Sequence, residues 1–145
     1  NFNIFPNEEV VHTDTVRTQL VKLAMEGHGV QIRPDGNMYC IKEFTMTKAG
    51  EAREPSRLAL QTAMQPGVQQ VDTSMLVQVV PLLELGAQFR PEMQRRQCDG
   101  PYLWCDENGA IVDNPVYNSL ATVLFGNYIY GSSVYGTVVL TCSFQ

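Results

Sequence analysis

After Arg96 this 145-residue chain contains no lysine or arginine. The same stretch carries Asp99, Asp106, Glu107 and Asp113, so it contributes −4 to the formal net charge of −5. Proteins that bind nucleic acid present a basic patch, so we expect no nucleic-acid partner. Charged residues make up only 17% of the chain and hydrophobic ones 44%. Disordered chains show the opposite balance, and the composition therefore predicts a folded chain.

Long apolar runs are also missing. No run approaches the roughly 18 residues of a transmembrane helix, and no charged-then-apolar signal segment opens the chain, so we expect no membrane insertion. The length suits a single domain with its own core. Because the chain begins at Asn1 and ends abruptly in Thr-Cys-Ser-Phe-Gln, we interpret residues 1–145 as one domain excised from a longer polypeptide.

The usual catalytic motifs are absent. There is no Gly-rich phosphate loop and no G-x-S-x-G elbow, and His12 and His28 do not form an H-E-x-x-H pattern. Asp72-Thr73-Ser74 resembles the Asp-Thr-Gly loop of aspartic proteases, with serine in place of glycine. Those enzymes need two carboxylates that share a proton, so a homodimer would have to supply the second. We expect no enzyme and keep a dimeric aspartic protease as an alternative.

The four cysteines, Cys40, Cys98, Cys105 and Cys142, show no C-x-x-C spacing. The absence of this spacing disfavours a zinc site or a thioredoxin-type motif. We expect buried free thiols, because unpaired cysteine is among the most buried residue types. In an oxidising compartment, four cysteines would allow three disulfide pairings.

The first half of the chain predicts a helix and a hairpin. Apolar residues recur at helical spacing over residues 14–26, with Thr13 or Asp14 as the cap. The Pro34-Asp35-Gly36-Asn37 turn then predicts a β-hairpin across residues 30–46. Residues 47–72 show no strand pattern and read as a long loop, with a short helix near Ser56–Met64 as the alternative.

The second half predicts mostly strands. Met75–Val80 indicates a buried strand that bends or reaches a sheet edge at Pro81, and the basic run Arg90–Arg96 indicates a solvated turn. The Asn108-Gly109 turn predicts a hairpin between Pro101–Cys105 and Ala110–Val112. Further strands are expected at Val116–Phe125, at Asn127–Tyr130 and from Val134 to Phe144, the last with one core face and one more polar face.

Together these elements predict a mainly β fold, an antiparallel β-sandwich or barrel of jelly-roll type with one or two short helices. The acidic residues near the Asn108-Gly109 turn suggest a Ca²⁺ site with Asp106 and Asp113 as ligands. A plain acidic hairpin explains the same cluster. We expect no other cofactor.

The helix-like residues 14–26 followed by Arg33-Pro34-Asp35-Gly36 resemble the opening of the protruding domain of nodavirus-like capsid proteins. The segment Tyr102-Leu103-Trp104-Cys105 and the ending Val134–Cys142 are similar to strands of small-RNA-virus coat proteins, the ending to the closing strand of jelly-roll capsid domains. The resemblance implies a virion-surface domain that forms homo-dimers or homo-trimers and attaches to a host-cell receptor of protein or glycan. It implies no catalytic residues.

Two surfaces would serve that role. Interface cores are rich in tyrosine, which nominates Tyr117, Tyr128, Tyr130 and Tyr135 as subunit contacts. The predicted loop from Thr47 to Val71 is the candidate host-facing element. The competing class is an all-β carbohydrate-binding module, in which Trp104 and three of these tyrosines, Tyr128, Tyr130 and Tyr135, would stack on sugar rings.

Overall fold

A computed structural model describes residues 13–42, 44, 46–47, 54–64, 77–107, 115–129 and 133–145. The described strands form one six-stranded sheet. Five of them follow the order β2-β1-β6-β5-β4, and the sixth, the short β3, pairs with β6 outside this order. The strands are β1 (Gly29–Ile32), β2 (Met38–Ile41), β3 (Met46–Thr47), β4 (Val77–Pro81), β5 (Cys98–Asp106) and β6 (Val138–Phe144). All pairs along this order are antiparallel, and β3 alone runs parallel to β6.

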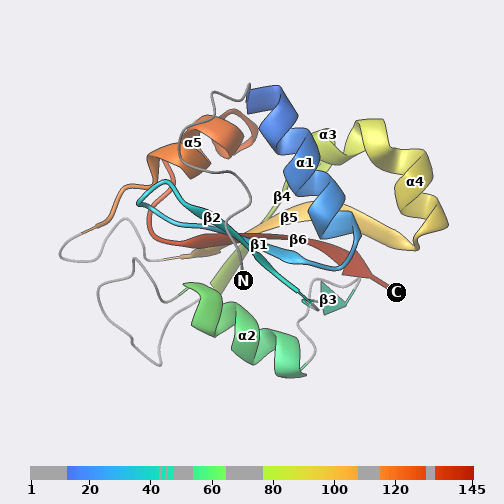
Figure 1. The fold of residues 1–145 in the computed structure, drawn as a ribbon, viewed down its shortest axis with the longest axis horizontal. Coiled ribbons are helices and arrows are strands. Elements are labelled where there is room, and N and C mark those ends of the chain that lie inside the picture. Colours follow the sequence, from blue (N-terminus) through green and yellow to red (C-terminus); the bar gives the residue numbers. More distant parts are fainter. Residues whose placement is uncertain are drawn as a thin grey trace.

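Helices cover both faces of this sheet (Figure 1). The helices are α1 (Thr13–Met25), α2 (Glu54–Met64), α3 (Leu83–Gly86), α4 (Arg90–Arg95) and α5 (Ser119–Phe125), with 3-10 turns at Ala87–Phe89 and Gly126–Tyr128. Helices α1, α3, α4 and α5 lie on one face, and α2 lies on the other. The described residues therefore build three layers, with the sheet in the middle.

Each face of the sheet has its own hydrophobic core. The larger core joins the sheet to α1 and α5, and its fully buried members include Leu20, Ile32, Leu103, Phe125 and Leu140. The smaller core joins the sheet to α2 and contains Phe44, Met46, Leu60, Ala63, Met64, Trp104 and Val139. Strand β6 supplies residues to both cores. The second face of this strand is more polar, as predicted, since it carries Thr141 and Ser143, but it is buried as well.

The first predicted elements are confirmed. The helix expected at 14–26 is α1, and the hairpin is β1–β2, with Val30 opposite Cys40. Its turn is closed by the Arg33 amide, which donates to the Asn37 carbonyl at 2.9 Å. The predicted second strand ran on to Met46, whereas β2 ends at Ile41 and Met46 pairs with β6 instead. Helix α2 contains the alternative helix Ser56–Met64, so this part of residues 47–72 is not a loop.

Two predicted strands and one predicted turn are helical. The strand expected at Val116–Phe125 is α5 from Ser119 on, and Asn127–Tyr130 overlaps a 3-10 turn at Gly126–Tyr128. The basic run Arg90–Arg96 is not a loose turn, since it forms α4 and buries Met93 against the core. The described residues thus contain five α-helices where one or two were expected.

The antiparallel sheet itself is as predicted. A sandwich or jelly roll has two packed sheets, whereas the described strands form one sheet with helices on both faces. Strand β4 lies at the edge that Pro81 indicated, but its side chains are exposed or half-buried rather than buried. Within the described ranges, no helix is both long enough and apolar enough to span a membrane.

Candidate functional site

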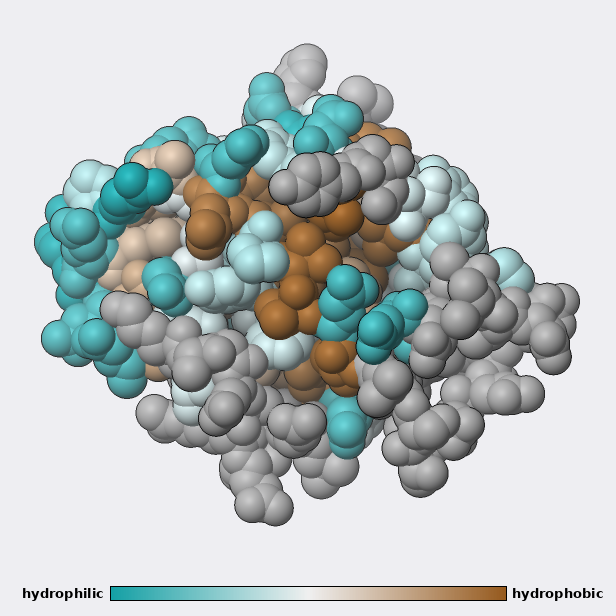
Figure 2. Space-filling view, turned by 180° about the vertical axis from the view of Figure 1, so that it is seen from behind, coloured by the Kyte–Doolittle hydropathy of each residue, from teal (hydrophilic) through white to brown (hydrophobic). Residues whose placement is uncertain are grey.

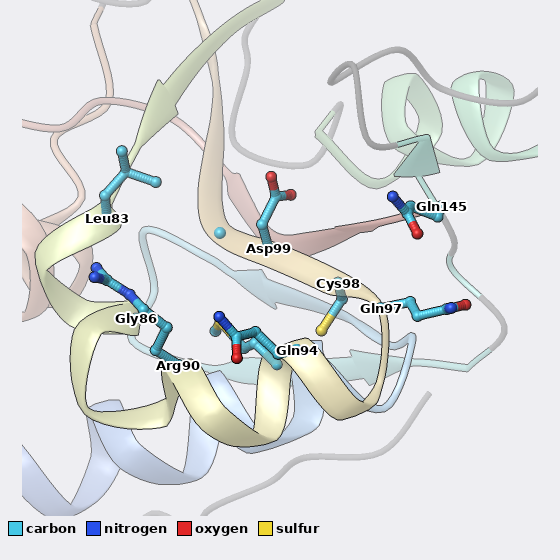
Figure 3. A pocket seen from close by; sticks show the side chains of 10 residues that line it. Leu83, Gly86, Arg90, Gln94, Gln97, Cys98, Asp99 and Gln145 are labelled. Carbon is cyan, nitrogen blue, oxygen red and sulfur yellow. The ribbon is translucent and has the colours of Figure 1, made fainter.

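A cavity of about 530 Å³ lies beside the first residues of β5, between that strand and helices α3 and α4 (Figure 3). Strand β4 pairs only with Tyr102–Asp106, so the stretch Cys98–Pro101 extends beyond it, and Cys98, Asp99 and Gly100 of this stretch line the cavity. The lining residues are Leu83, Gly86, Arg90, Met93, Gln94, Gln97, Cys98, Asp99, Gly100 and Gln145.

Two glycines let the cavity wall form. A Cβ atom on Gly86 would stand 2.1 Å from the carbonyl oxygen of Gly100, so α3 and β5 approach with no room for a side chain. Gly100 has a φ of +127°, a conformation that glycine adopts far more readily than other residues. Gln97 follows the end of α4 with a φ of +55°, in the left-handed region. Its backbone carbonyl accepts a hydrogen bond from the backbone N–H of Gln145 at 3.1 Å. These turns bring the chain end to the cavity.

The polar groups of the cavity are one guanidinium, three amides, one carboxylate and one thiol. Figure 3 shows the Cys98 sulfur pointing from β5 toward α4, whereas the Asp99 carboxylate points away from α4. Neighbouring strand residues face opposite sides, so this carboxylate is not placed to act as a base on the thiol. No histidine lines the cavity. The cavity therefore offers several hydrogen-bonding groups and one cationic group to a small polar molecule.

Asp99 has an uncommon environment. One of its carboxylate oxygens is buried without a hydrogen-bond partner among the described residues. The hydroxyl of Ser143, which stands opposite it on β6, is also buried and unpaired. Burial raises the pKa of Tyr102, and the negative charge and hydrogen bond of Asp99 raise it further. Tyr102 therefore stays protonated and donates its hydroxyl to Asp99.

All four cysteines are free thiols, as the sequence predicted. Cys40, Cys98 and Cys142 are buried, and Cys105 is half-buried. Burial raises the pKa of Cys40, and it raises the pKa of Cys105 to about 12. The hydrogen bond from Cys142 lowers the pKa of Cys98, and the same contact raises that of Cys142.

The nominated Ca²⁺ ligands are placed only in part. Asp106 ends β5 opposite Val77, and Asp113 lies outside the described residues. No group of three or more His, Cys, Asp or Glu side chains that could hold a metal occurs in the described part of the chain. The protease-like Asp72 and the histidine His12 also lie outside that part. The calcium and protease hypotheses therefore stay predictions.

Of the tyrosines nominated for an interface, the structure brings Tyr117 and Tyr135 into contact. The rings of Tyr117 and Tyr135 meet edge to face at 5.7 Å, and Tyr117 is 48% exposed. Tyr128 lies beyond the other end of α5, where the Arg17 guanidinium stands 5.6 Å from its ring. Tyr130 lies outside the described residues.

The sugar-stacking hypothesis fails at its tryptophan. Trp104 is buried between the sheet and α2, and its indole N–H donates to the Thr141 hydroxyl at 2.8 Å. Its ring faces are covered by the smaller core, so Trp104 offers no platform for a sugar.

An apolar surface that sequence reasoning missed follows the β4 edge. Figure 2, which views the molecule from behind relative to Figure 1, shows hydrophobic side chains gathered in the middle of that side. Val79 is 36% exposed and Leu83 56% exposed. A groove of about 490 Å³ continues the surface and is lined by Val80, Pro81, Leu82, Leu83, Glu84, Asn127, Tyr128 and Ile129. The nearly continuous apolar run Met75–Val80 is the only sequence signal for this surface, and such a run predicts a buried strand instead.

No protein-family model, curated protein or solved structure matches the chain.

Proposed function

We propose that the chain is a non-catalytic viral capsid surface domain that acts by binding proteins, first of all further copies of itself. The observation that carries this proposal is the exposed apolar edge formed by β4 and the start of α3. Soluble proteins usually protect such an edge, because its free backbone groups and apolar side chains invite pairing with another chain.

The chemistry of the edge favours a second copy as the partner. Strand β4 reads Val-Gln-Val-Val-Pro and contains no charged residue, so the β4 strands of two copies can pair without repulsion between like charges. Glu84 of α3 is the charged residue that lines the adjoining groove. Within the described residues β5 is the only strand that pairs with β4. A two-fold axis beside Val79 would place the two edges antiparallel, and each copy would then bury the apolar surface of the other.

The capsid role is supported by the resemblance and by the elements that carry it. The expected helix is α1, and the two expected strands are β1 and β2, with the Pro-Asp-Gly turn between them. The two later segments lie in β5 and around β6. The domain would stand on the virion surface and present loops to a host receptor. The jelly-roll sandwich of such proteins remains a prediction, since the described strands form one sheet.

Sedimentation velocity with charged variants tests the self-association. We expect the unaltered protein to dimerise with increasing concentration and Leu83→Lys to weaken the dimer at least tenfold, because each copy would bury a lysine ammonium in the contact. Val123→Lys is the matched control, since Val123 is also 56% exposed but lies on α5.

Two results would count against the proposal. One is an unaltered protein that stays monomeric up to the highest attainable concentration. The other is an equal loss of dimer in Leu83→Lys and Val123→Lys, which would move the contact away from the β4 edge. Circular dichroism of each variant establishes that it is folded before the comparison is made.

A further inference from the structure

Cys98 and Cys142 lie on neighbouring strands and face the same side of the sheet. Cys98 on β5 stands opposite Phe144 on β6, and Cys142 is two residues back along β6, so the two cysteines form a diagonal cross-strand pair. Both side chains belong to the larger core. The register shifts between Asp99 and Tyr102, directly beside the pair.

The two thiols are in hydrogen-bonding contact, and only one of them borders open space. Cys98 lines the cavity of about 530 Å³, and its sulfur points toward α4 in Figure 3. Cys142 is almost completely buried. The hydrogen bond from Cys142 and the charge of Arg96 both lower the pKa of Cys98. Since the thiolate is the reactive form, Cys98 is the thiol that a reagent in the cavity meets first.

The sheet order excludes every other cysteine pair. Strands β1 and β6 separate Cys40 on β2 from the two cysteines on β5, a distance of roughly 14 Å at the usual strand spacing. Strand β1 likewise separates Cys40 from Cys142 by about 10 Å. Cys105 follows Trp104, which stands opposite Val139, so Cys142 lies more than about 10 Å away along the strands. Cys98 and Cys105 lie seven residues apart on one strand, more than about 20 Å. These separations all exceed the roughly 7 Å between Cα atoms that a disulfide spans by several ångströms, whereas the side chains of Cys98 and Cys142 are already in contact.

We propose that Cys98 and Cys142 form an oxidisable dithiol, which a small disulfide entering the cavity converts into a cross-strand disulfide. The Cys98 thiolate attacks one sulfur of the reagent, the reagent S–S bond breaks, and one thiolate leaves. Cys142 then gives its proton to this thiolate and attacks the Cys98 sulfur, which releases the other half of the reagent as a thiolate that takes a proton from water. The protein loses two electrons and two protons, and the reagent is reduced to two thiols. The product joins β5 to β6 beside the cavity.

Glutathione disulfide is the probe for this proposal, and mass spectrometry of peptides gives the readout. Trypsin would leave Cys98, Cys105 and Cys142 on one peptide, because the chain has no lysine or arginine after Arg96. Chymotrypsin cuts after aromatic residues and leucine and separates them. We expect a Cys98–Cys142 cross-link in the folded protein and in the control variants Cys40→Ser and Cys105→Ser.

The reaction order gives a second readout. Cys142→Ser should stop at a glutathione adduct on Cys98, and Cys98→Ser should give neither adduct nor cross-link. The proposal is overturned if a cross-link forms through Cys40 or Cys105. It is also overturned if the folded parent protein keeps all four thiols under conditions in which the urea-unfolded chain reacts. The parent protein decides this outcome even where a serine variant fails to fold.

Discussion

Replacing Gly86 by alanine is expected to lower the free energy of unfolding by roughly 3 kcal/mol, at the upper end of the cost of overpacking. The new Cβ would lie 2.1 Å from the Gly100 carbonyl oxygen, a distance that real atoms cannot keep. The obstacle is backbone rather than a flexible side chain, so α3 would have to move away from β5. The backbone of Gly86 itself is not strained, with φ −79° and ψ −13°.

Gly36→Ala is the matched control for this variant. Gly36 has a φ of +87° in the β1–β2 turn, and nothing lies within 4 Å of the position that its Cβ would take. Its substitution adds only conformational strain, about 1–2 kcal/mol. Urea unfolding followed by circular dichroism compares the two. A loss in Gly86→Ala no greater than that in Gly36→Ala would show that α3 does not hold this close approach in solution.

Local patterns predicted the parts of the fold that local physics determines. Helix α1 shows apolar residues at helical spacing, and the β1–β2 turn has a proline and a glycine where such a turn requires them. Helix α5 was missed because its Thr122 and Val123, with Phe125, favour strands by composition. The better signal was Asn118, a good N-cap residue directly before Ser-Leu-Ala.

The site depended on contacts that no local pattern encodes. The cavity wall needs Gly86 to meet Gly100 across two elements, and the basic run of α4 has one buried apolar side chain, Met93, to anchor it. Whether the side chains of an apolar strand are buried depends on its place in the sheet. Among the described strands β4 is last in the order, and its side chains are exposed or half-buried. The sequence left three disulfide pairings open, and the strand order excludes all three as complete sets, because each needs a bond to Cys40 on the distant β2; Cys98–Cys142 remains as a single pair.

Asn118 joins three separate parts of the chain at one buried point. Its side-chain amide donates to the Ile32 carbonyl at 3.0 Å and to the Gly136 carbonyl at 2.8 Å. Its side-chain oxygen accepts from the Ala121 amide at 3.0 Å and so caps α5. The residue is fully buried. One side chain therefore ties the end of β1, the segment before β6 and the start of a helix together.

Asn118→Ala is expected to cost roughly 3–5 kcal/mol of stability, because it leaves one amide and two carbonyls unpaired in the interior. Asn127→Ala is the matched control, since Asn127 is exposed. This variant should change the free energy of unfolding by no more than about 0.5 kcal/mol. Urea midpoints measure both. An Asn118→Ala protein as stable as the control would mean that water replaces these bonds.

Asn118→Asp makes the same site sensitive to pH. At pH 7 its carboxylate would face the carbonyl oxygens of Ile32 and Gly136 in the interior, whereas the protonated acid can donate one hydrogen bond to them. Burial and the two facing carbonyl oxygens raise the pKa of this group in the folded state above its unfolded value of about 3.9, and they outweigh the opposing hydrogen bond from the Ala121 amide at the start of α5. The folded variant binds the proton more tightly than the unfolded chain, so its stability is fully present below the unfolded pKa and is lost as the pH rises through the folded pKa. Relative to the unaltered protein, the variant should lose less stability at pH 4 than at pH 7. An equal loss at both pH values would show that the carboxylate escapes to water.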